Sequence, residues 1–328
     1  MKTNRNKSVS LNQSYFRIAL TIVVGLLMTG MAMAQDSWVT VNPMPVTRFD
    51  LAAVAGPNGH MYVIGGNYSG QSSPYLPLNH TEVYDPITDF WKAVAPMPTS
   101  RGGPAAAVGP NGLIYVFGGH DRNLVPLDTV EAYDPVGNTW VSKASMPTAR
   151  MFSAAATGSD GRIYVMGGAI GPGAGMNTVE AYDPITDSWQ TVTPMPTPRY
   201  VLAAVAHPDG LIYAIGGADT GNPALNTVEA FDPQTGVWAP MPSLTTGRYS
   251  PAAAVGQNGR IYVFGGHNID PLDTVEAYDT VAQIWNFVAS MPTARYDLGA
   301  ATAADGSVFV IGGYGVSGPV QVVERYTP

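Results

Sequence analysis

The sequence predicts an all-β protein in which six equivalent four-stranded sheets repeat along the chain. Two observations lead to this fold class: the spacing of the tryptophans and the spacing of paired glycines. Successive tryptophans lie 53, 49, 49, 49 and 47 residues apart, and successive Gly-Gly pairs follow the same intervals. Such self-similarity at a fixed period is typical of repeat architectures. The tryptophans are Trp38, Trp91, Trp140, Trp189, Trp238 and Trp285, and the glycine pairs begin at Gly65, Gly118, Gly167, Gly216, Gly265 and Gly312.

Each repeat carries the signals of four antiparallel strands, which we name a to d in chain order. In the second repeat, strand a is the Ala-rich stretch 105–108, and the pair Asn111-Gly112 follows it. Asn-Gly and Asp-Gly pairs accept the positive φ angles that a two-residue hairpin requires. Strand b, residues 114–117, ends at the glycine pair. Strand c carries Thr-Val-Glu-Ala-Tyr at 129–133, and an Asp-Pro turn then leads to the Trp of strand d.

Radial packing explains both the repeat and its composition. A four-stranded unit of this size cannot bury both faces alone, whereas six units around one axis cover each other and leave only short edges. Ala and Gly in strand a suit the crowded axis, and the aromatic residues of the later strands suit the wider outer region. No segment has a sustained 3.6-residue apolar period, so we expect almost no helix.

The two ends of the repeat predict how the ring closes. The first repeat segment, residues 38–40, is a strand d, whereas the last, residues 322–326, is a strand c. We therefore expect the N-terminal strand to join the last sheet. The result is a six-bladed β-propeller that forms one domain over residues 35–328.

A period near 50 residues that carries Gly-Gly, then Tyr, then Trp resembles the kelch repeat. The resemblance covers residues 38–326 and implies four-stranded antiparallel kelch blades in a six-bladed β-propeller. It is specific for the fold. It does not define a function, because kelch proteins include enzymes as well as binding scaffolds.

The first 34 residues have the pattern of a bacterial-type secretory signal peptide. A basic region precedes the short apolar stretch 18–31, and Ala32-Met33-Ala34 forms a cleavage signal. The apolar stretch is shorter than the ~20 residues that a membrane span needs, so we expect no stable membrane anchor. We expect cleavage near Ala34 and a secreted or periplasmic protein. The basic residues are Lys2, Arg5, Lys7 and Arg17.

Charge and cysteine content exclude several classes of function. The chain has a formal net charge of −8, and removal of four basic residues with the signal segment would change it to −12. This balance argues against nucleic-acid partners, which need clustered Lys and Arg. The absence of Cys excludes disulfides, thiolate metal sites and a Cys nucleophile. We expect no cofactor, no metal and a monomeric protein.

An Arg lies ten residues after every Trp, just before strand a and near the rim of the central channel. Six guanidinium groups around one opening would form an anion-binding site. In the alternative, which we favour, each Arg bonds loop carbonyls or pairs with the Glu of strand c and so holds the blades. The resemblance keeps the first alternative open, because some arginines at this position contact acidic ligands in kelch proteins that bind peptides. The residues are Arg48, Arg101, Arg150, Arg199, Arg248 and Arg295.

The residue after the Arg is aromatic in four blades: Phe49, Tyr200, Tyr249 and Tyr296. These side chains would form an aromatic arc on which sugar faces or peptide side chains could stack. The alternative is packing between blades, since Tyr commonly buries its ring and keeps its hydroxyl in water.

Asp50 and Asp297 follow two members of the arc and lie in adjacent blades, so they are the best acid/base pair that the sequence offers. We favour a turn-bonding or solvated role for them. His120 and His267 follow the glycine pairs of opposite blades and could share a ligand only across the channel. The sequence therefore predicts no metal site and no catalytic set.

The b–c connections vary between repeats, whereas the hairpin face is nearly uniform, and variable loops favour a binding surface. We predict an exported binding module that takes a protein or carbohydrate ligand, including an anionic one, at the channel mouth and the b–c face. An intracellular adaptor is a further alternative, against which the signal segment argues.

A carbohydrate-acting enzyme is the main alternative. The galactose oxidase family needs a Cys–Tyr cross-link, which a chain without Cys cannot form. The sialic-acid mutarotases are similar in being exported, kelch-like and six-bladed, and an Arg rim would suit a sugar carboxylate. Their catalytic residues do not match this chain one by one.

Overall fold

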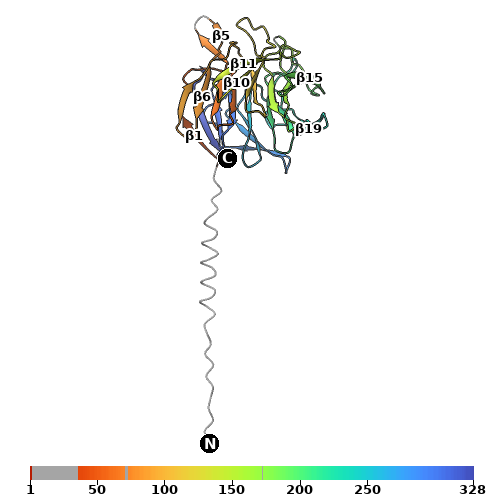
Figure 1. Cartoon of the computed structure of the whole chain (residues 1–328). Coiled ribbons are helices and arrows are strands. Elements are labelled where there is room, and N and C mark those ends of the chain that lie inside the picture. Colours follow the sequence, from red (N-terminus) through yellow and green to blue (C-terminus); the bar gives the residue numbers. More distant parts are fainter. Residues whose placement is uncertain (2–35, 71–72, 172) are drawn as a thin grey trace. The chain divides into compact units, whose positions relative to one another are not determined.

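In the computed structural model, the repeat builds six four-stranded antiparallel sheets. Figure 1 shows the strands as arrows, coloured along the sequence. The structure describes residues 1, 36–70, 73–171 and 173–328. The predicted signal peptide, residues 1–34, lies outside the described residues apart from Met1. Residues 36–328 form one compact unit, and its described part contains strands and turns but no helix. Accordingly, no helix that could cross a membrane is found among the described residues.

The blades follow each other along the chain, and each runs from strand a to strand d. Blade 1 comprises β2 (Ala52–Ala55), β3 (Met61–Ile64), β6 (Thr81–Asp85) and β7 (Phe90–Ala93). Blade 2 comprises β8 (Ala105–Val108), β9 (Ile114–Phe117), β10 (Val130–Asp134) and β11 (Thr139–Lys143). Blade 3 comprises β12 (Ala154–Thr157), β13 (Ile163–Met166), β14 (Val179–Asp183) and β15 (Ser188–Val192).

The remaining blades keep the same strand order. Blade 4 comprises β16 (Ala203–Ala206), β17 (Ile212–Ile215), β18 (Val228–Asp232) and β19 (Val237–Met241). Blade 5 comprises β20 (Ala252–Val255), β21 (Ile261–Phe264), β22 (Val275–Asp279) and β23 (Ile284–Val288). Blade 6 comprises β25 (Gly299–Thr302), β26 (Val308–Ile311), β29 (Val323–Thr327) and β1 (Ser37–Val41). Short accessory strands are β4 (Asn67–Gly70), β5 (Ser73–Pro77), β24 (Arg295–Tyr296), β27 (Tyr314–Gly315) and β28 (Gly318–Pro319).

The N-terminal strand closes the ring as predicted. Strand β1 pairs antiparallel with β29, and Trp38 lies opposite Tyr326. The innermost strands contact one another in a complete circle, in which β25 of blade 6 touches β2 of blade 1. The fold is therefore a six-bladed β-propeller, and its axis is lined by the Ala-rich strands a.

The a–b hairpins differ from the two-residue turn that the sequence predicts. Only the Gly of each Asn-Gly or Asp-Gly pair has a positive φ, as at Gly112 (φ +79°). The amide of Gly109 bonds the carbonyl of Leu113 (2.8 Å), so three residues form the loop. In a three-residue loop the Gly alone adopts the left-handed conformation, so Asn111 does not need a positive φ. Its side-chain amide instead donates to the hydroxyl of Tyr115 (2.9 Å).

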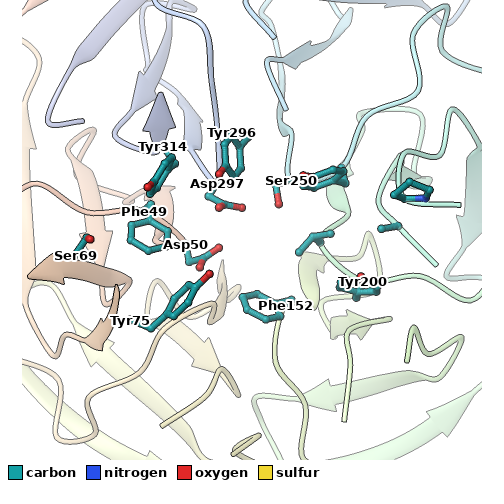
Figure 2. A pocket seen from close by; sticks show the side chains of 14 residues that line it. Phe49, Asp50, Ser69, Tyr75, Phe152, Tyr200, Ser250, Tyr296, Asp297 and Tyr314 are labelled. Carbon is teal, nitrogen blue, oxygen red and sulfur yellow. The ribbon is translucent and has the colours of Figure 1, made fainter. Parts of the chain in front are cut away.

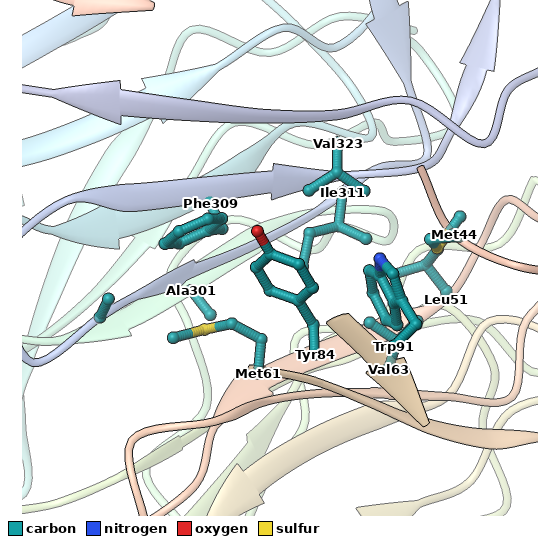
Figure 3. Packing of buried hydrophobic residues seen from close by; sticks show 11 residues of the cluster. Met44, Leu51, Met61, Val63, Tyr84, Trp91, Ala301, Phe309, Ile311 and Val323 are labelled. Atoms are coloured by element: carbon teal, nitrogen blue, oxygen red, sulfur yellow. The ribbon is translucent and has the colours of Figure 1, made fainter. Parts of the chain in front are cut away.

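Aromatic side chains pack between neighbouring blades. In the cluster between blades 1 and 6, Tyr84 packs against Phe309 with ring centroids 5.4 Å apart, and Met61 and Ile311 lie beside them (Figure 3). The Trp of each blade adds a directional contact, because its indole N–H donates to a carbonyl in the d–a connection of the preceding blade. The acceptors, from Trp38 to Trp285 in order, are Ala289, Asn42, Ala95, Ala144, Thr193 and Pro242.

Candidate functional site

A closed ring of six backbone hydrogen bonds surrounds the propeller axis. In each blade, the residue two positions after the repeated Arg donates its amide to the carbonyl of the equivalent residue in the preceding blade, over 2.8–3.1 Å. The bond from Asp50 to Asp297 closes the ring between the first and last blades. We call these six residues the axial ring. They are Asp50, Gly103, Phe152, Val201, Ser250 and Asp297.

The axial ring holds its backbone in a left-handed conformation. All six φ angles lie between +47° and +57°. Residues with a side chain rarely adopt this conformation, and a β-branched residue such as Val201 is a clear outlier. Strained backbone of this kind concentrates at functional sites. The ring therefore fixes the position of five side chains, since its sixth member, Gly103, has none.

A pocket of about 500 Å³ lies above the axial ring, on the face of the b–c connections (Figure 2). This volume is within the usual range for small-molecule sites. The ring supplies Asp50, Phe152, Val201, Ser250 and Asp297. The position after the Arg supplies Phe49, Tyr200, Tyr249 and Tyr296. The b–c connections supply Ser69, Tyr75, Ala218, Pro223 and Tyr314.

The predicted aromatic arc lines this pocket and is extended by two tyrosines that sequence reasoning missed. The ring of Phe49 contacts those of Tyr75 (5.8 Å between centroids) and Tyr314 (5.3 Å). The arc continues from Tyr314 to Tyr296 (5.4 Å) and from Tyr296 to Tyr249 (6.2 Å). Phe49 itself is buried between blades, whereas the tyrosines are partly exposed. Phe49 thus packs between blades, as the second alternative has it, whereas the tyrosines remain accessible from the pocket.

Asp50 and Asp297 lie side by side in the pocket, where Figure 2 shows their carboxyl groups near its centre. Burial raises the pKa of Asp50 well above its ordinary value, and the charge of Asp297 raises it further. Burial raises the pKa of Asp297 to about 6, against hydrogen bonds from Ser250 and Asp50 that lower it. Two carboxyls that share a site in this way ionise one after the other, and the pair holds a proton at pH values where isolated Asp residues have lost theirs.

A buried amide positions Asp50. The side-chain amide of Asn67, itself fully buried, donates to Asp50 Oδ2 (3.0 Å) and lies 3.2 Å from His120 Nε2. His120 Nδ1 lies 2.9 Å from the carbonyl of Asp121, which requires a proton on Nδ1 and leaves Nε2 to accept from Asn67. Burial also lowers the pKa of His120. A neutral His120 thus orients Asn67, and Asn67 orients Asp50.

The sequence contained a signal that would have found Asn67. It occupies the position after the glycine pair, as His120 and His267 do in their blades. In each blade this residue bridges to the residue after the Arg, for example Asn67 to Phe49. The whole position, not only its histidines, therefore borders the pocket region.

The two histidines serve separate clusters. His120 contacts Asn67 and Phe152, whereas His267 stacks on Tyr249 (5.0 Å between ring centroids) and meets the edge of Tyr296 (4.9 Å). Within residues 36–70, 73–171 and 173–328, no three His, Asp or Glu side chains gather in a way that could hold a metal ion.

The six repeated arginines lie inside the blades, not at the pocket. Each has an exposed fraction of 0% and pairs with the Glu of strand c. Arg101, for example, donates to Glu131 Oε2 (2.5 Å) and to the carbonyls of Gly118 and Thr129. This geometry matches the structural role that we favoured and leaves no guanidinium surface for a ligand. The pairs are Arg48–Glu82, Arg101–Glu131, Arg150–Glu180, Arg199–Glu229, Arg248–Glu276 and Arg295–Glu324.

The fold and the site together define a class, a six-bladed β-propeller with a ligand-sized pocket on its axis. The chain belongs to the kelch-repeat family: the family model of the KLHDC2/KLHL20/DRC7 Kelch-repeats domain matches residues 141–313, more than half of the chain. The Kelch motif model matches residues 48–98 and 101–147. The resemblance drawn from the glycine pairs, Tyr and Trp is therefore confirmed.

Individual similar proteins share the fold but cover different amounts of the chain. An F-box/kelch-repeat protein of Arabidopsis thaliana is 39% identical over 85 residues, which are 26% of this chain and 21% of that protein. The matched region thus spans about a fifth of this relative. The solved structure of YjhT matches with a TM-score of 0.71 at 17% identity and covers 87% of this chain and 95% of its own. At that identity the likeness shows the fold alone.

Proposed function

We propose that this chain is an exported binding module that takes up a protein ligand on the face of its b–c connections, with the axial pocket at the centre of the contact. The observation that carries the proposal is the pocket, whose lining differs from blade to blade although the backbone beneath it is uniform. Kelch propellers generally serve as protein-interaction modules, which favours a protein partner over other ligands.

Exposed aliphatic side chains on the b–c connections support a macromolecular partner. Five blades each present one whose exposed fraction lies between 46% and 88%. The c–d turns on the opposite face expose aliphatic side chains too, so it is the pocket that distinguishes the b–c face. The residues are Leu76, Val125, Ile170, Ile269 and Val316.

Selection of peptides from a displayed library against the purified chain tests this function. We expect binders with micromolar or tighter dissociation constants, whose affinity falls at least tenfold in Ile269→Asp. The matched control is Ile185→Asp, since Ile185 is equally exposed (89%) but lies in a c–d turn. A library without binders would contradict the proposal, and so would an equal loss of peptide affinity in Ile269→Asp and Ile185→Asp.

Export is a separate part of the proposal, and residues 1–34 motivate it. In a bacterial host that secretes the protein, we expect the mature N-terminus to follow Ala34. N-terminal sequencing of the exported protein is the measurement, and an intact Met1 on cytoplasmic protein would contradict export.

A second candidate function is a carbohydrate-acting enzyme of the mutarotase type, and the Asp50–Asp297 pair favours it. Opening a sugar hemiacetal needs an acid at the ring oxygen and a base at the anomeric hydroxyl, and reclosure returns both protons. A carboxyl pair that holds one proton offers both groups. However, the described residues that line the pocket include no Lys or Arg for the carboxylate of a sialic acid, so a neutral sugar fits better.

Exchange spectroscopy by NMR tests this second candidate. Anomer exchange of glucose, galactose and sialic acid is followed with and without the chain, and Asp50→Asn should abolish any acceleration. Asp270→Asn is the matched control, because Asp270 is exposed on the same face but does not line the pocket. No acceleration by the unaltered chain removes this candidate.

A further inference from the structure

We infer that the axial pocket binds an organic cation, an alkylammonium or guanidinium group of the kind that a Lys or Arg side chain of a bound protein presents. The inference rests on the proposed function, to which it adds the chemistry of the central contact. Three features of the pocket carry it: its aromatic wall, its two carboxyl groups and the absence of any basic side chain among the described residues that line it.

The aromatic wall is suited to a cation. Five rings follow each other around one side of the pocket, from Tyr249 through Tyr296, Tyr314 and Phe49 to Tyr75. Aromatic faces attract ammonium and guanidinium groups electrostatically, and the attraction grows when water is excluded. Aromatic cages of several rings are a known means of recognising quaternary ammonium groups in proteins.

The carboxyl pair supplies charge that no Lys or Arg among the described residues lining the pocket compensates. Every repeated Arg is buried in a pair with its own Glu and is absent from the pocket lining. Asp50 and Asp297 are therefore held close together by the axial ring without a cationic partner. The two carboxylates repel each other when both are ionised, and a ligand cation between them would offset this repulsion.

The groups around the pair are neutral or weakly basic. On the blade 1 side, Asn67 donates to Asp50, and His120 behind it is kept neutral. On the blade 5 side, Ser250 bonds Asp297, and His267 lies nearby and weakly stabilises the charge of Asp297. The remaining titratable side chains among the described residues that line the pocket are Tyr75, Tyr200, Tyr249, Tyr296 and Tyr314.

Cation binding is therefore coupled to proton release. The pair retains a proton because its pKa values are raised by burial and mutual repulsion. A bound cation would stabilise the ionised carboxyls and lower those pKa values. By linkage, the affinity for the cation then rises as the pH rises through the titration of the pair, and each binding event releases part of a proton.

A neutral ligand would behave differently in the same pocket. A sugar can stack on the tyrosines and hydrogen-bond either form of the carboxyls, so its affinity would change little with pH. The net charge of −8 adds a long-range preference, since a negative surface draws cations toward the molecule and repels anions.

Calorimetric titration with simple probes tests the inference. We expect n-butylammonium and Nα-acetyl-arginine amide to bind at pH 7.5 at least tenfold tighter than the uncharged n-butanol. Their affinity should fall at least fivefold at pH 4.5. Titrations in buffers of different ionisation enthalpy should show proton release that is largest around the pH where the pair titrates.

Variants assign the effect to the pair. Asp297→Asn and Asp50→Asn should each weaken n-butylammonium binding at least tenfold, whereas Asp270→Asn should leave it within twofold. If the first two variants unfold, carboxyl ¹³C shifts of Asp50 and Asp297 in the unaltered chain give the same answer. Their titration midpoints should move to lower pH when n-butylammonium is added.

The outcomes separate this inference from the proposed function. Equal affinity for n-butylammonium and n-butanol, or midpoints that do not move, would overturn the cation site. Library peptides that bind equally well after every Lys and Arg is replaced would also overturn it, while the binding module would stand. If neither the probes nor any peptide binds, both proposals fail.

Discussion

Two positions that lie only two residues apart in each blade have opposite patterns of variation. The first is Arg in all six blades and is fully buried against a Glu. The second, the axial ring, carries five different residue types on a backbone that is nearly identical from blade to blade. The comparison teaches that repetition marks what holds a propeller together. Variation on a fixed backbone marks where it meets a ligand.

The largest effect that would sharpen this comparison is expected at the repeated Arg. Arg101→Ala should lower the free energy of unfolding by about 3–5 kcal/mol, since it leaves the charge of Glu131 buried without a partner. Urea denaturation followed by tryptophan fluorescence is the measurement.

Arg260→Ala is the control for this prediction. Arg260 is exposed and pairs with Asp279 at 3.4 Å on the surface. Because an exposed pair contributes only about 0–1 kcal/mol, the variant should stay close to the unaltered chain. Similar losses of unfolding free energy in the two variants would mean that the buried pair contributes no more to stability than a surface pair does.

A smaller effect is expected from pH at the axial ring. Because the pKa values of Asp50 and Asp297 are raised on folding, the native state binds more protons than the unfolded chain, so stability falls as pH rises. Between pH 4 and pH 7 we expect a loss of about 1–3 kcal/mol, since one pKa unit corresponds to about 1.4 kcal/mol.

The double variant Asp50→Asn/Asp297→Asn should remove most of this pH dependence. Unfolding free energies at pH 4, 5.5 and 7 are compared in the two proteins. If the unfolding free energy of the double variant falls equally between pH 4 and pH 7, other groups cause the pH dependence. The contrast between the repeated Arg and the axial ring would then not hold for pH.

The smallest effect is expected at Val201. Its φ of +47° is costly for a β-branched residue, whereas Asn accepts this conformation. Val201→Asn should therefore stabilise the fold by up to about 1 kcal/mol. Val237→Asn, on an exposed strand position, serves as the control and should give no gain. A loss of stability in Val201→Asn would show that the backbone strain costs less free energy than the contacts of the Val201 side chain contribute.

The repeat predicted the fold almost completely, because the spacing of its Trp and Gly-Gly residues can be read directly from the sequence. The Trp frame gave the number of blades, and the unmatched strands at Trp38 and Tyr326 gave the closure. The carboxyl pair could also be placed in adjacent blades by counting. The axial ring could not be foreseen, because left-handed backbone at Phe152 or Val201 contradicts their residue preferences.

The rest of the site was hidden for a different reason. Tyr75 and Tyr314 reach the pocket through b–c connections, whose paths depend on tertiary contacts and not on the repeat. Asn67 follows its glycine pair in the sequence, but its role in the site is clear only from its bridge to Phe49 and its bond to Asp50. Irregular connections carry little periodic signal, and here they supply five of the fourteen described residues that line the pocket.

The hydrogen bond from Asp50 to Asp297 has a consequence for how the protein matures. It joins residues 247 positions apart in the sequence, so it can form only after nearly the whole chain has been synthesised. Contacts of such long range form late and slowly. The two acidic groups come together in that same event, so a nascent or truncated chain has no complete binding centre. Ligand affinity would then serve as a readout of finished assembly.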